Sequence, residues 1–191
     1  MIKAQKYSAY LAKRSLLGLI YRKLILYPAL CKYLDGVVLD VGCGIGDLLE
    51  FRRGAIGVDV NSFNVKICKQ KGLNAQIMEP DYLPFSDQIF DSILLDNVLE
   101  HIERPGKLID EIRRVLRPSG SLLVGVPGIK GYLSDRDHKV FYDEKGLADL
   151  AVKHGFTVHK LFYMPLLKSS WLSERLRQYC IYTVWIKNPL A

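Results

Sequence analysis

Residues 36–46 read Gly-Val-Val-Leu-Asp-Val-Gly-Cys-Gly-Ile-Gly, and this stretch decides the fold class of the chain. Its apolar run, broken only by Asp40, is typical of a strand that is buried on both faces of a parallel sheet. Gly42, Gly44 and Gly46 then follow at alternate positions. Because glycine tolerates positive φ and has no Cβ, such a loop brings its backbone N–H groups close to a ligand. We therefore predict a buried strand that ends in a ligand-binding turn.

The next apolar run, over 55–60, predicts a second strand that ends in Asp59. A carboxylate at the tip of the strand beside a glycine loop is placed to accept hydrogen bonds from two ribose hydroxyls. We therefore predict an adenosine-containing cofactor that contacts Asp59 and the following Val60 and Asn61. Asn61 fits a second role equally well, as the N-cap of the helix that begins there.

The glycine spacing distinguishes between cofactors. The dinucleotide fingerprint G-x-G-x-x-G places a pyrophosphate at a helix N-terminus. Here the third glycine comes one residue early, and Asp47 stands where the fingerprint has its last glycine. A carboxylate there would repel a pyrophosphate, but it suits a ligand with an amino group and a sulfonium.

Residues 79–126 carry a second set of motifs in a fixed order. An acidic residue is followed by Leu-Pro-Phe over 83–85, Phe-Asp at 90–91 and Leu-Glu-His over 99–101, and the set ends with Glu-Ile-x-Arg-Val-Leu-x-Pro-x-Gly over 111–120. Together with the glycine loop, these motifs resemble the type 11 group of the class I S-adenosylmethionine-dependent methyltransferases. The resemblance covers about 37–126, with a weaker similarity over 138–156.

The resemblance implies S-adenosylmethionine as the cofactor and assigns roles around it. The three glycines approach the methionine and ribose parts, and Asp40 faces the amino group, with a purely structural cap as its alternative. Glu79 corresponds to the acidic residue near the adenine amino group, and Asp81 competes for that role. Asn97 lies at the methyl-donating end, where we prefer it to Asp96. His138 is the candidate catalytic base, with a structural role as its alternative.

The chain is expected to be an α/β protein: a Rossmann-like three-layer sandwich, with a seven-stranded, mostly parallel sheet whose last strand is antiparallel. A helix over 6–27 should stop at Pro28, and residues 1–35 should form a helical lid on a methyltransferase domain over 36–191. The expected strands are 36–41, 55–60, 74–78, 89–95, 120–126, 156–164 and 179–186. The expected helices after the lid are 47–52, 62–71, 105–117 and 143–154, with a linker over 127–142 and a connection over 165–178.

Composition narrows the class of protein. The chain has 191 residues, of which 49% are hydrophobic and 25% charged, as in a globular domain. Its four cysteines form no C-x-x-C pair, so we predict neither a metal site nor a disulfide framework. Charged residues interrupt every long apolar stretch, and we see no secretory signal, so we expect a cytoplasmic protein.

The net charge of +7 is concentrated at the two ends of the chain. Residues 1–35 hold seven Lys or Arg and one Asp, and residues 160–191 hold five and one Glu. Because aromatic residues accompany these cations, we expect an anionic acceptor and peripheral contact with a membrane. The leading hypothesis is a methyltransferase that acts on a small molecule, a sugar or a lipid-linked glycan, with nucleic acid disfavoured. An RNA or protein methyltransferase and an inactive cofactor-binding scaffold are the alternatives, and the oligomeric state stays open.

Overall fold

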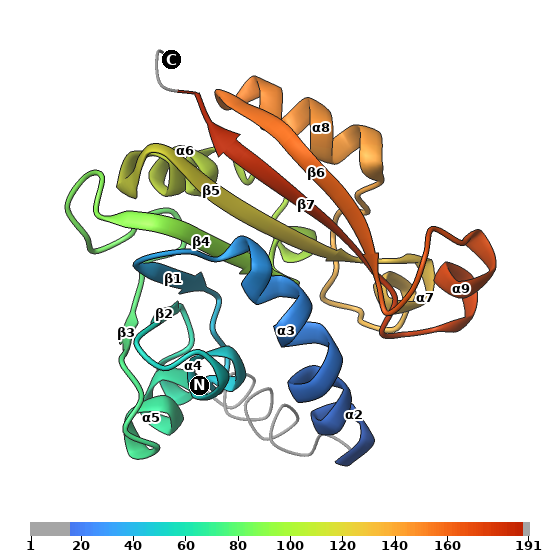
Figure 1. Ribbon diagram of the computed structural model, residues 1–191, viewed down its shortest axis with the longest axis horizontal. Helices are drawn as coiled ribbons and strands as arrows, with labels where there is room; N and C mark the ends of the chain where they lie inside the picture. Colours follow the sequence, from blue (N-terminus) through green and yellow to red (C-terminus); the bar gives the residue numbers. More distant parts are fainter. Residues whose placement is uncertain (1–15, 189–191) are drawn as a thin grey trace.

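The computed structural model describes residues 16–188, which form one seven-stranded sheet in the order β3-β2-β1-β4-β5-β7-β6 (Figure 1). Neighbouring strands are parallel from β3 to β5, whereas β7 runs antiparallel to both β5 and β6. This confirms the predicted Rossmann-like sheet with its antiparallel last strand. The strands are β1 (Val38–Val41), β2 (Ile56–Asp59), β3 (Ala75–Ile77), β4 (Phe90–Asp96), β5 (Leu116–Pro127), β6 (Phe156–Met164) and β7 (Cys180–Lys187).

Helices cover both faces of the sheet, which makes the three layers (Figure 1). One face packs against α6 (Gly106–Val115) and α8 (Glu144–Lys153), and the other against α4 (Asp47–Phe51) and α5 (Ser62–Gln70). The second face is also covered by the N-terminal helical segment, which consists of α2 (Leu16–Tyr21), η1 (Arg22–Leu26), α3 (Tyr27–Leu30) and η2 (Cys31–Tyr33). Three short elements complete the fold: η3 (Leu99–His101), α7 (Ile129–Leu133) and α9 (Ser170–Arg175).

The strand order reverses between β1 and β4, because the chain builds the sheet outward in both directions from these two strands. Ligands of open α/β sheets bind at such a switch point, beyond the carboxyl ends of the strands. The glycine loop leaves β1 at this position, and Asp96 ends β4 beside it. The topology therefore places the predicted cofactor loop where this class of fold binds its ligands.

The N-terminal helical segment differs from the prediction, which ended its helix before Pro28. The described part of this segment continues to Tyr33, because a π-helical turn over Arg22–Leu26 precedes the proline. Pro28 then stands in the first turn of α3, where its missing N–H costs little. Leu30 is fully buried in the core on this face of the sheet. Residues 1–15 lie outside the described residues, so the division into a lid and a domain at residue 35 stays a prediction.

β5 also begins earlier than predicted. The expected helix to residue 117 ends at Val115, and β5 starts at Leu116 rather than at residue 120. Its pairing with β4 is irregular between Phe90 and Ser92, and Ser119 has a φ of 60°. A bulge of this kind is one of the few places where a strand accommodates a proline, here Pro118. The expected linker and connection also contain α7 and α9, which were not predicted.

The Leu-Pro-Phe and Glu-x-x-Arg motifs hold each other in the structure. Glu111 accepts a hydrogen bond from the Leu83 N–H at 3.0 Å, and Arg114 donates to the Leu83 carbonyl at 3.0 Å and the Phe85 carbonyl at 2.8 Å. Arg114 also forms a bidentate pair with Glu111. These motif residues therefore fix the segment that leads from β3 to β4. Among residues 16–188, no helix has the length and apolar character needed to span a membrane.

Candidate active site

The glycine loop has the backbone conformation that its sequence predicts. Gly42, Gly44 and Gly46 have φ angles of 78°, 55° and 88°, in the left-handed region that favours glycine. A Cβ on Gly42 would overlap the side chain of Val98, so this glycine also allows the loop to approach the segment after β4. The Gly42 N–H donates to the Val58 carbonyl at 2.8 Å, which fixes the start of the loop against the end of β2.

Asp59 holds the glycine loop from the tip of β2. Its carboxylate accepts hydrogen bonds from the Gly44 N–H at 2.8 Å, the Asn61 N–H at 2.7 Å and the Asn64 side chain at 3.1 Å. Burial raises the pKa of Asp59, although these three donors act in the opposite direction. A carboxylate has about four acceptor positions, so roughly one remains for a ligand. The structure thus places Asp59 beside the loop as predicted, and its main observed partners are protein donors.

A cluster of acidic and phenolic groups lies at the switch point between β1 and β4. Asp40 is buried, and this burial, followed by the nearby Asp96 and Asp59, raises its pKa well above the usual range. Asp96 accepts a hydrogen bond from the Tyr182 hydroxyl at 2.9 Å. Gly125 makes room for this pair, because a Cβ there would overlap both side chains. Asp96 rather than Asn97 is therefore the strand-end residue with the most polar neighbours.

The N-terminal helical segment adds Tyr21, Arg22 and Tyr27 to this cluster (Figure 1). Arg22 donates a hydrogen bond to the Tyr27 hydroxyl at 3.4 Å. Burial opposes the charge of Arg22, but the neighbouring Tyr27 and Asp96 raise its pKa above the usual range. The Tyr21 hydroxyl is buried and has no hydrogen-bond partner, and burial raises its pKa. Sequence reasoning assigned no site role to Arg22, because its only signal was a charge within an apolar stretch.

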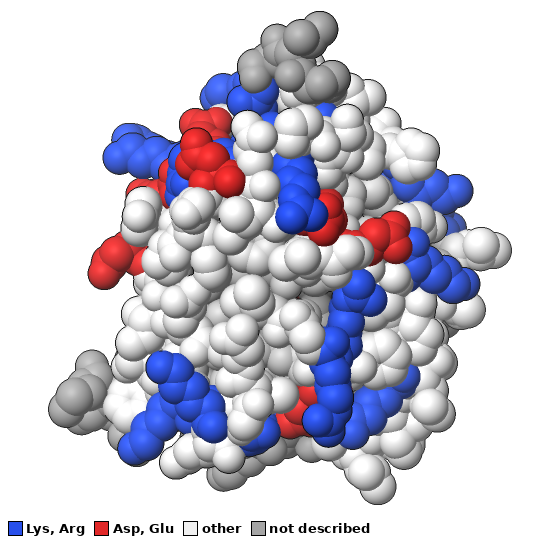
Figure 2. Space-filling view, turned by 60° about the vertical axis from the view of Figure 1, so that its left-hand side comes forward, with Lys and Arg blue, Asp and Glu red and all other residues white. Residues whose placement is uncertain are grey.

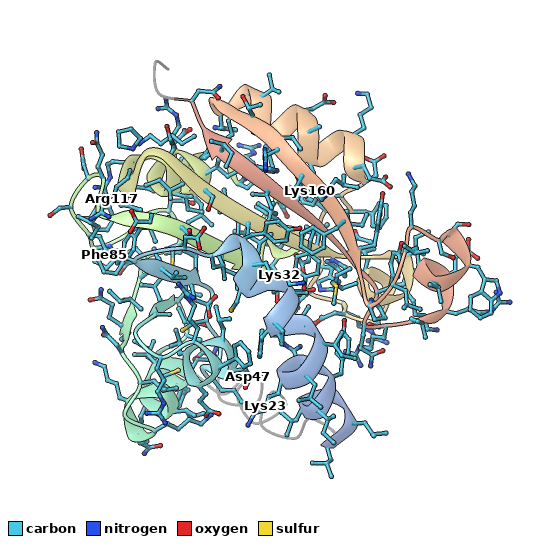
Figure 3. All side chains as sticks on the ribbon, viewed as in Figure 1. Lys23, Lys32, Asp47, Phe85, Arg117 and Lys160 are labelled. Atoms are coloured by element: carbon cyan, nitrogen blue, oxygen red, sulfur yellow. The ribbon has the colours of Figure 1, made fainter. Side chains whose placement is uncertain are left out.

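The other predicted cofactor residues have different surroundings. The Asn61 side chain accepts a hydrogen bond from the Phe63 N–H at 3.0 Å, so it caps α5 as the helix-cap alternative predicted. Val60 is 58% exposed, and Glu79 and Asp81 are also exposed near the end of β3. Whether any of these contacts the cofactor stays a prediction. In Figure 3, Asp47 lies at the start of α4, toward the helical segment that carries Lys23.

Asn97 turns the chain away from β4. It has a φ of 55°, and its side chain donates to the Asp96 carboxylate at 2.8 Å. Its backbone N–H donates to the Gly125 carbonyl at 2.8 Å. These contacts hold Asp96 and the chain that follows it, and they leave the Asn97 side-chain oxygen at the edge of the cluster, 3.8 Å from the Cys180 sulfur.

The candidate base His138 lies after α7 and faces η3. Its Nδ1 lies 2.8 Å from the Tyr132 carbonyl oxygen, and its ring packs edge-on against that of His101, with centroids 4.6 Å apart. Its Nε2 lies 3.8 Å from a carboxylate oxygen of Glu100. Glu100 is 1% exposed, and burial raises its pKa to about 8. The sequence analysis named neither Glu100 nor His101 as a site residue.

Comparison with known proteins assigns the family. The fold and the glycine loop define an α/β protein that binds a nucleoside cofactor at the switch point of its sheet, and residues 39–124 match the family model described as "Methyltransferase domain". The chain belongs to the class I S-adenosylmethionine-dependent methyltransferases, type 11 group, as the motifs predicted. S-adenosylmethionine is the cofactor that this family implies.

Individual relatives cover only part of their own length. An uncharacterized protein of Methanocaldococcus jannaschii is 34% identical over 107 residues, which is 56% of this chain and 50% of that protein. A tRNA (carboxymethyluridine(34)-5-O)-methyltransferase of Arabidopsis thaliana is 31% identical over 110 residues, which is 52% of this chain and 27% of that protein. Because such a relative acts on tRNA, the expectation that nucleic acid is disfavoured loses its support.

The fold as a whole has a close structural counterpart. A SAM-dependent methyltransferase of Thermotoga maritima, described as a possible histamine N-methyltransferase, superposes with a TM-score of 0.77. The match covers 97% of this chain and 99% of that one at 19% identity, so it bears on the fold and not on the acceptor.

Proposed function

We propose that this protein transfers a methyl group from S-adenosylmethionine to an acceptor bound beside η3 and the N-terminal helical segment. The observation that carries the proposal is the glycine loop, held by Asp59 at the switch point of the sheet opposite the Asp40–Asp96 cluster. When bound, the cofactor supplies an electrophilic methyl group on a sulfonium.

The charges of the cluster suit the methionine end of this cofactor. That end carries an ammonium and a carboxylate, and the cluster offers acidic groups, Asp40 and Asp96, beside the buried guanidinium of Arg22. In our proposal the acidic pair binds the ammonium, and Arg22 binds the carboxylate. Val60 and the acidic residues Glu79 and Asp81 then border the adenosine end, beyond β2 and β3.

Much of the rate of such a transfer can come from holding donor and acceptor in line. A general base is needed only when the acceptor is a hydroxyl or another protonated group. His138 stays the candidate base, through its Nε2, since its Nδ1 lies against the Tyr132 carbonyl. The buried, unpartnered hydroxyl of Tyr21 is a second group that can hydrogen-bond to an acceptor.

We further propose an anionic acceptor with an apolar part, such as a lipid-linked glycan at a membrane surface. Large apolar side chains stand exposed on the N-terminal helical segment, with Leu17 79% exposed, and before α9, with Leu167 82% exposed. On α9, Arg175 lies 4.8 Å from the ring of the exposed Trp171, an arrangement that suits membrane interfaces. On the face in Figure 2, Lys and Arg side chains border the lower part, and most Asp and Glu side chains lie above them. An RNA acceptor is the second candidate, favoured by the tRNA methyltransferase among the relatives.

Two measurements test the proposed function. Calorimetric titration should show binding of S-adenosylmethionine at one site per chain, and transfer of labelled methyl groups should follow when anionic lipid-linked glycans or tRNA are supplied. Binding without transfer to any acceptor would support the inactive scaffold. Absence of cofactor binding would overturn the proposal.

A further inference from the structure

Glu100, His101 and His138 form a compact cluster beside the cofactor region. One potential ligand atom from each residue can be chosen so that all three lie within 4.8 Å of one another. Glu100 and His101 belong to η3, which follows Asp96, whereas His138 comes from the segment after α7. The sequence separates these residues by more than thirty positions, and the fold brings them together.

The Glu100 carboxyl group is the unusual member of the cluster. The residue is 1% exposed, and neither of its carboxylate oxygens has a hydrogen-bond partner. A buried carboxylate is costly to keep without partners, and native proteins rarely do so. Asp96 and Asp135 add further negative charge around it. The surroundings of Glu100 therefore call for a cation.

Both histidines are oriented to provide a lone pair. His101 Nδ1 lies 3.3 Å from the Asp137 carbonyl oxygen, and His138 Nδ1 lies 2.8 Å from the Tyr132 carbonyl oxygen. A carbonyl only accepts hydrogen bonds, so each Nδ1 carries the proton in the neutral ring, and each Nε2 keeps its lone pair. Metal-binding histidines in proteins commonly donate their other ring N–H to a carbonyl in this way.

We propose that Glu100, His101 and His138 bind a divalent first-row transition metal ion. Two imidazoles and one carboxylate suit ions such as Mn²⁺, Fe²⁺ or Zn²⁺, with ligand distances of about 2.0–2.2 Å. Ligand atoms up to 4.8 Å apart reach these distances after small inward rotations of the side chains. Three protein ligands leave coordination positions open, as in catalytic rather than structural sites.

The location of the site gives the metal a role that rests on the proposed function. The open positions face the acceptor end, three residues beyond Asn97. A metal ion there binds oxygen donors, so it favours an acceptor that presents a hydroxyl. It also lowers the pKa of a bound hydroxyl. The metal would thus reduce the need for a general base such as His138.

Metal titration of the full chain, freed of metal by a chelator, tests the site. Mn²⁺ is the probe, because it prefers carboxylate and imidazole ligands, whereas Zn²⁺ also binds the free thiols of Cys43 and Cys68. Calorimetry and electron paramagnetic resonance should show one saturable site. Glu100→Gln and His138→Asn should weaken Mn²⁺ binding by more than the roughly 10–100-fold that loss of an outer-shell partner costs.

The matched control is His154→Asn. His154 Nδ1 lies 2.7 Å from an Asp110 carboxylate oxygen, so this variant removes another histidine–carboxylate pair and should leave Mn²⁺ binding unchanged. Circular dichroism confirms that each variant folds, and titration with S-adenosylmethionine is run separately. Absence of saturable Mn²⁺ binding, or equal binding by wild type and both cluster variants, overturns the metal site. Loss of cofactor binding in the wild type would instead overturn the proposed function.

Discussion

Asp59 and Glu100 are both buried carboxylates near the carboxyl edge of the sheet, yet their surroundings are opposite. Asp59 is 6% exposed and accepts three hydrogen bonds from the glycine loop and the start of α5. Glu100 is 1% exposed and accepts none through its side chain. The cofactor end is thus held together by the protein's own donors. The acceptor end keeps polar atoms without protein partners, and such atoms are a mark of groups reserved for a ligand.

The largest expected effect is at the satisfied carboxylate. Asp59→Ala should reduce S-adenosylmethionine affinity at least about 100-fold, because it releases Gly44 and Asn61 and removes the last acceptor position for the ribose. Each buried donor left without a partner costs about 1–3 kcal/mol, so the melting temperature should fall as well. Calorimetry and thermal unfolding measure the two effects.

Asp59→Asn is the control for this prediction, since it keeps the shape and one acceptor oxygen. It should bind the cofactor with an affinity between those of the wild type and Asp59→Ala. Unchanged affinity in Asp59→Ala would show that the carboxylate is dispensable for the cofactor end.

The opposite change in stability is expected at the unsatisfied carboxylate. Glu100→Met should raise the free energy of unfolding of the metal-free protein by about 1–3 kcal/mol, because it replaces a buried, unpartnered carboxyl group by an apolar side chain of similar size. Asp59→Leu, the matched change at the satisfied site, should lower it. Denaturant titration after chelator treatment gives both values. A loss of stability in Glu100→Met would mean that the carboxyl group has a stabilising partner in the folded protein.

A smaller effect is expected in the pH dependence of cofactor binding, through Asp40. Burial and the neighbouring acidic groups raise its pKa well above the usual range, and a bound ammonium should lower it again. Binding below the pKa of the free protein therefore releases a proton, and affinity should rise with pH by up to about tenfold per unit. In Asp40→Asn this slope should disappear. Calorimetry in buffers of different ionisation enthalpy counts the protons, and equal slopes in both proteins would contradict this role.

The same sign applies to stability. Because the pKa of Asp40 is higher in the folded than in the unfolded chain, the folded state binds more protons at pH values between the two. Without the cofactor, the contribution of Asp40 to stability is therefore lost as pH rises from its ordinary pKa through its raised pKa. Asp40→Asn should show less of this loss.

The sequence predicted the part of the site that consecutive residues build. Asp40, the three glycines and Asp59 lie within twenty residues, and buried-strand and glycine patterns report directly on that backbone. Tyr182 could not be found in this way, because it reaches Asp96, 86 residues earlier, only after β7 inserts beside β5. Arg22 and His138 likewise depend on how distant segments fold back over the sheet.

Local rules also failed where tertiary contacts overrode them. Pro28 predicts the end of a helix, but burial of Leu30 and Leu34 against the sheet favours continuing it, and the π-helical turn makes this possible. Similarly, Arg117 and Pro118 suggest a helix end, yet Leu116 is already fully buried and pairs with β4. In both cases packing outweighs the propensity of single residues.

The smallest expected effect tests whether Asp96 belongs with the satisfied carboxylate or the unsatisfied one. Tyr182→Phe removes the hydroxyl that donates to Asp96 at 2.9 Å, and leaves the ring packed against Phe162. Asp96 keeps its bond from the Asn97 side chain, so the loss should be about 1 kcal/mol, and cofactor affinity should change no more than roughly fivefold. Tyr163→Phe removes a comparable bond, to Glu144 at 2.8 Å on the far side of β6 and β7, and should leave affinity unchanged. If Tyr182→Phe instead tightens cofactor binding, the hydroxyl competes with the ammonium for Asp96, and this carboxylate resembles Glu100 in being held for a ligand. A loss much larger than fivefold would mean that Tyr182 itself contacts the cofactor.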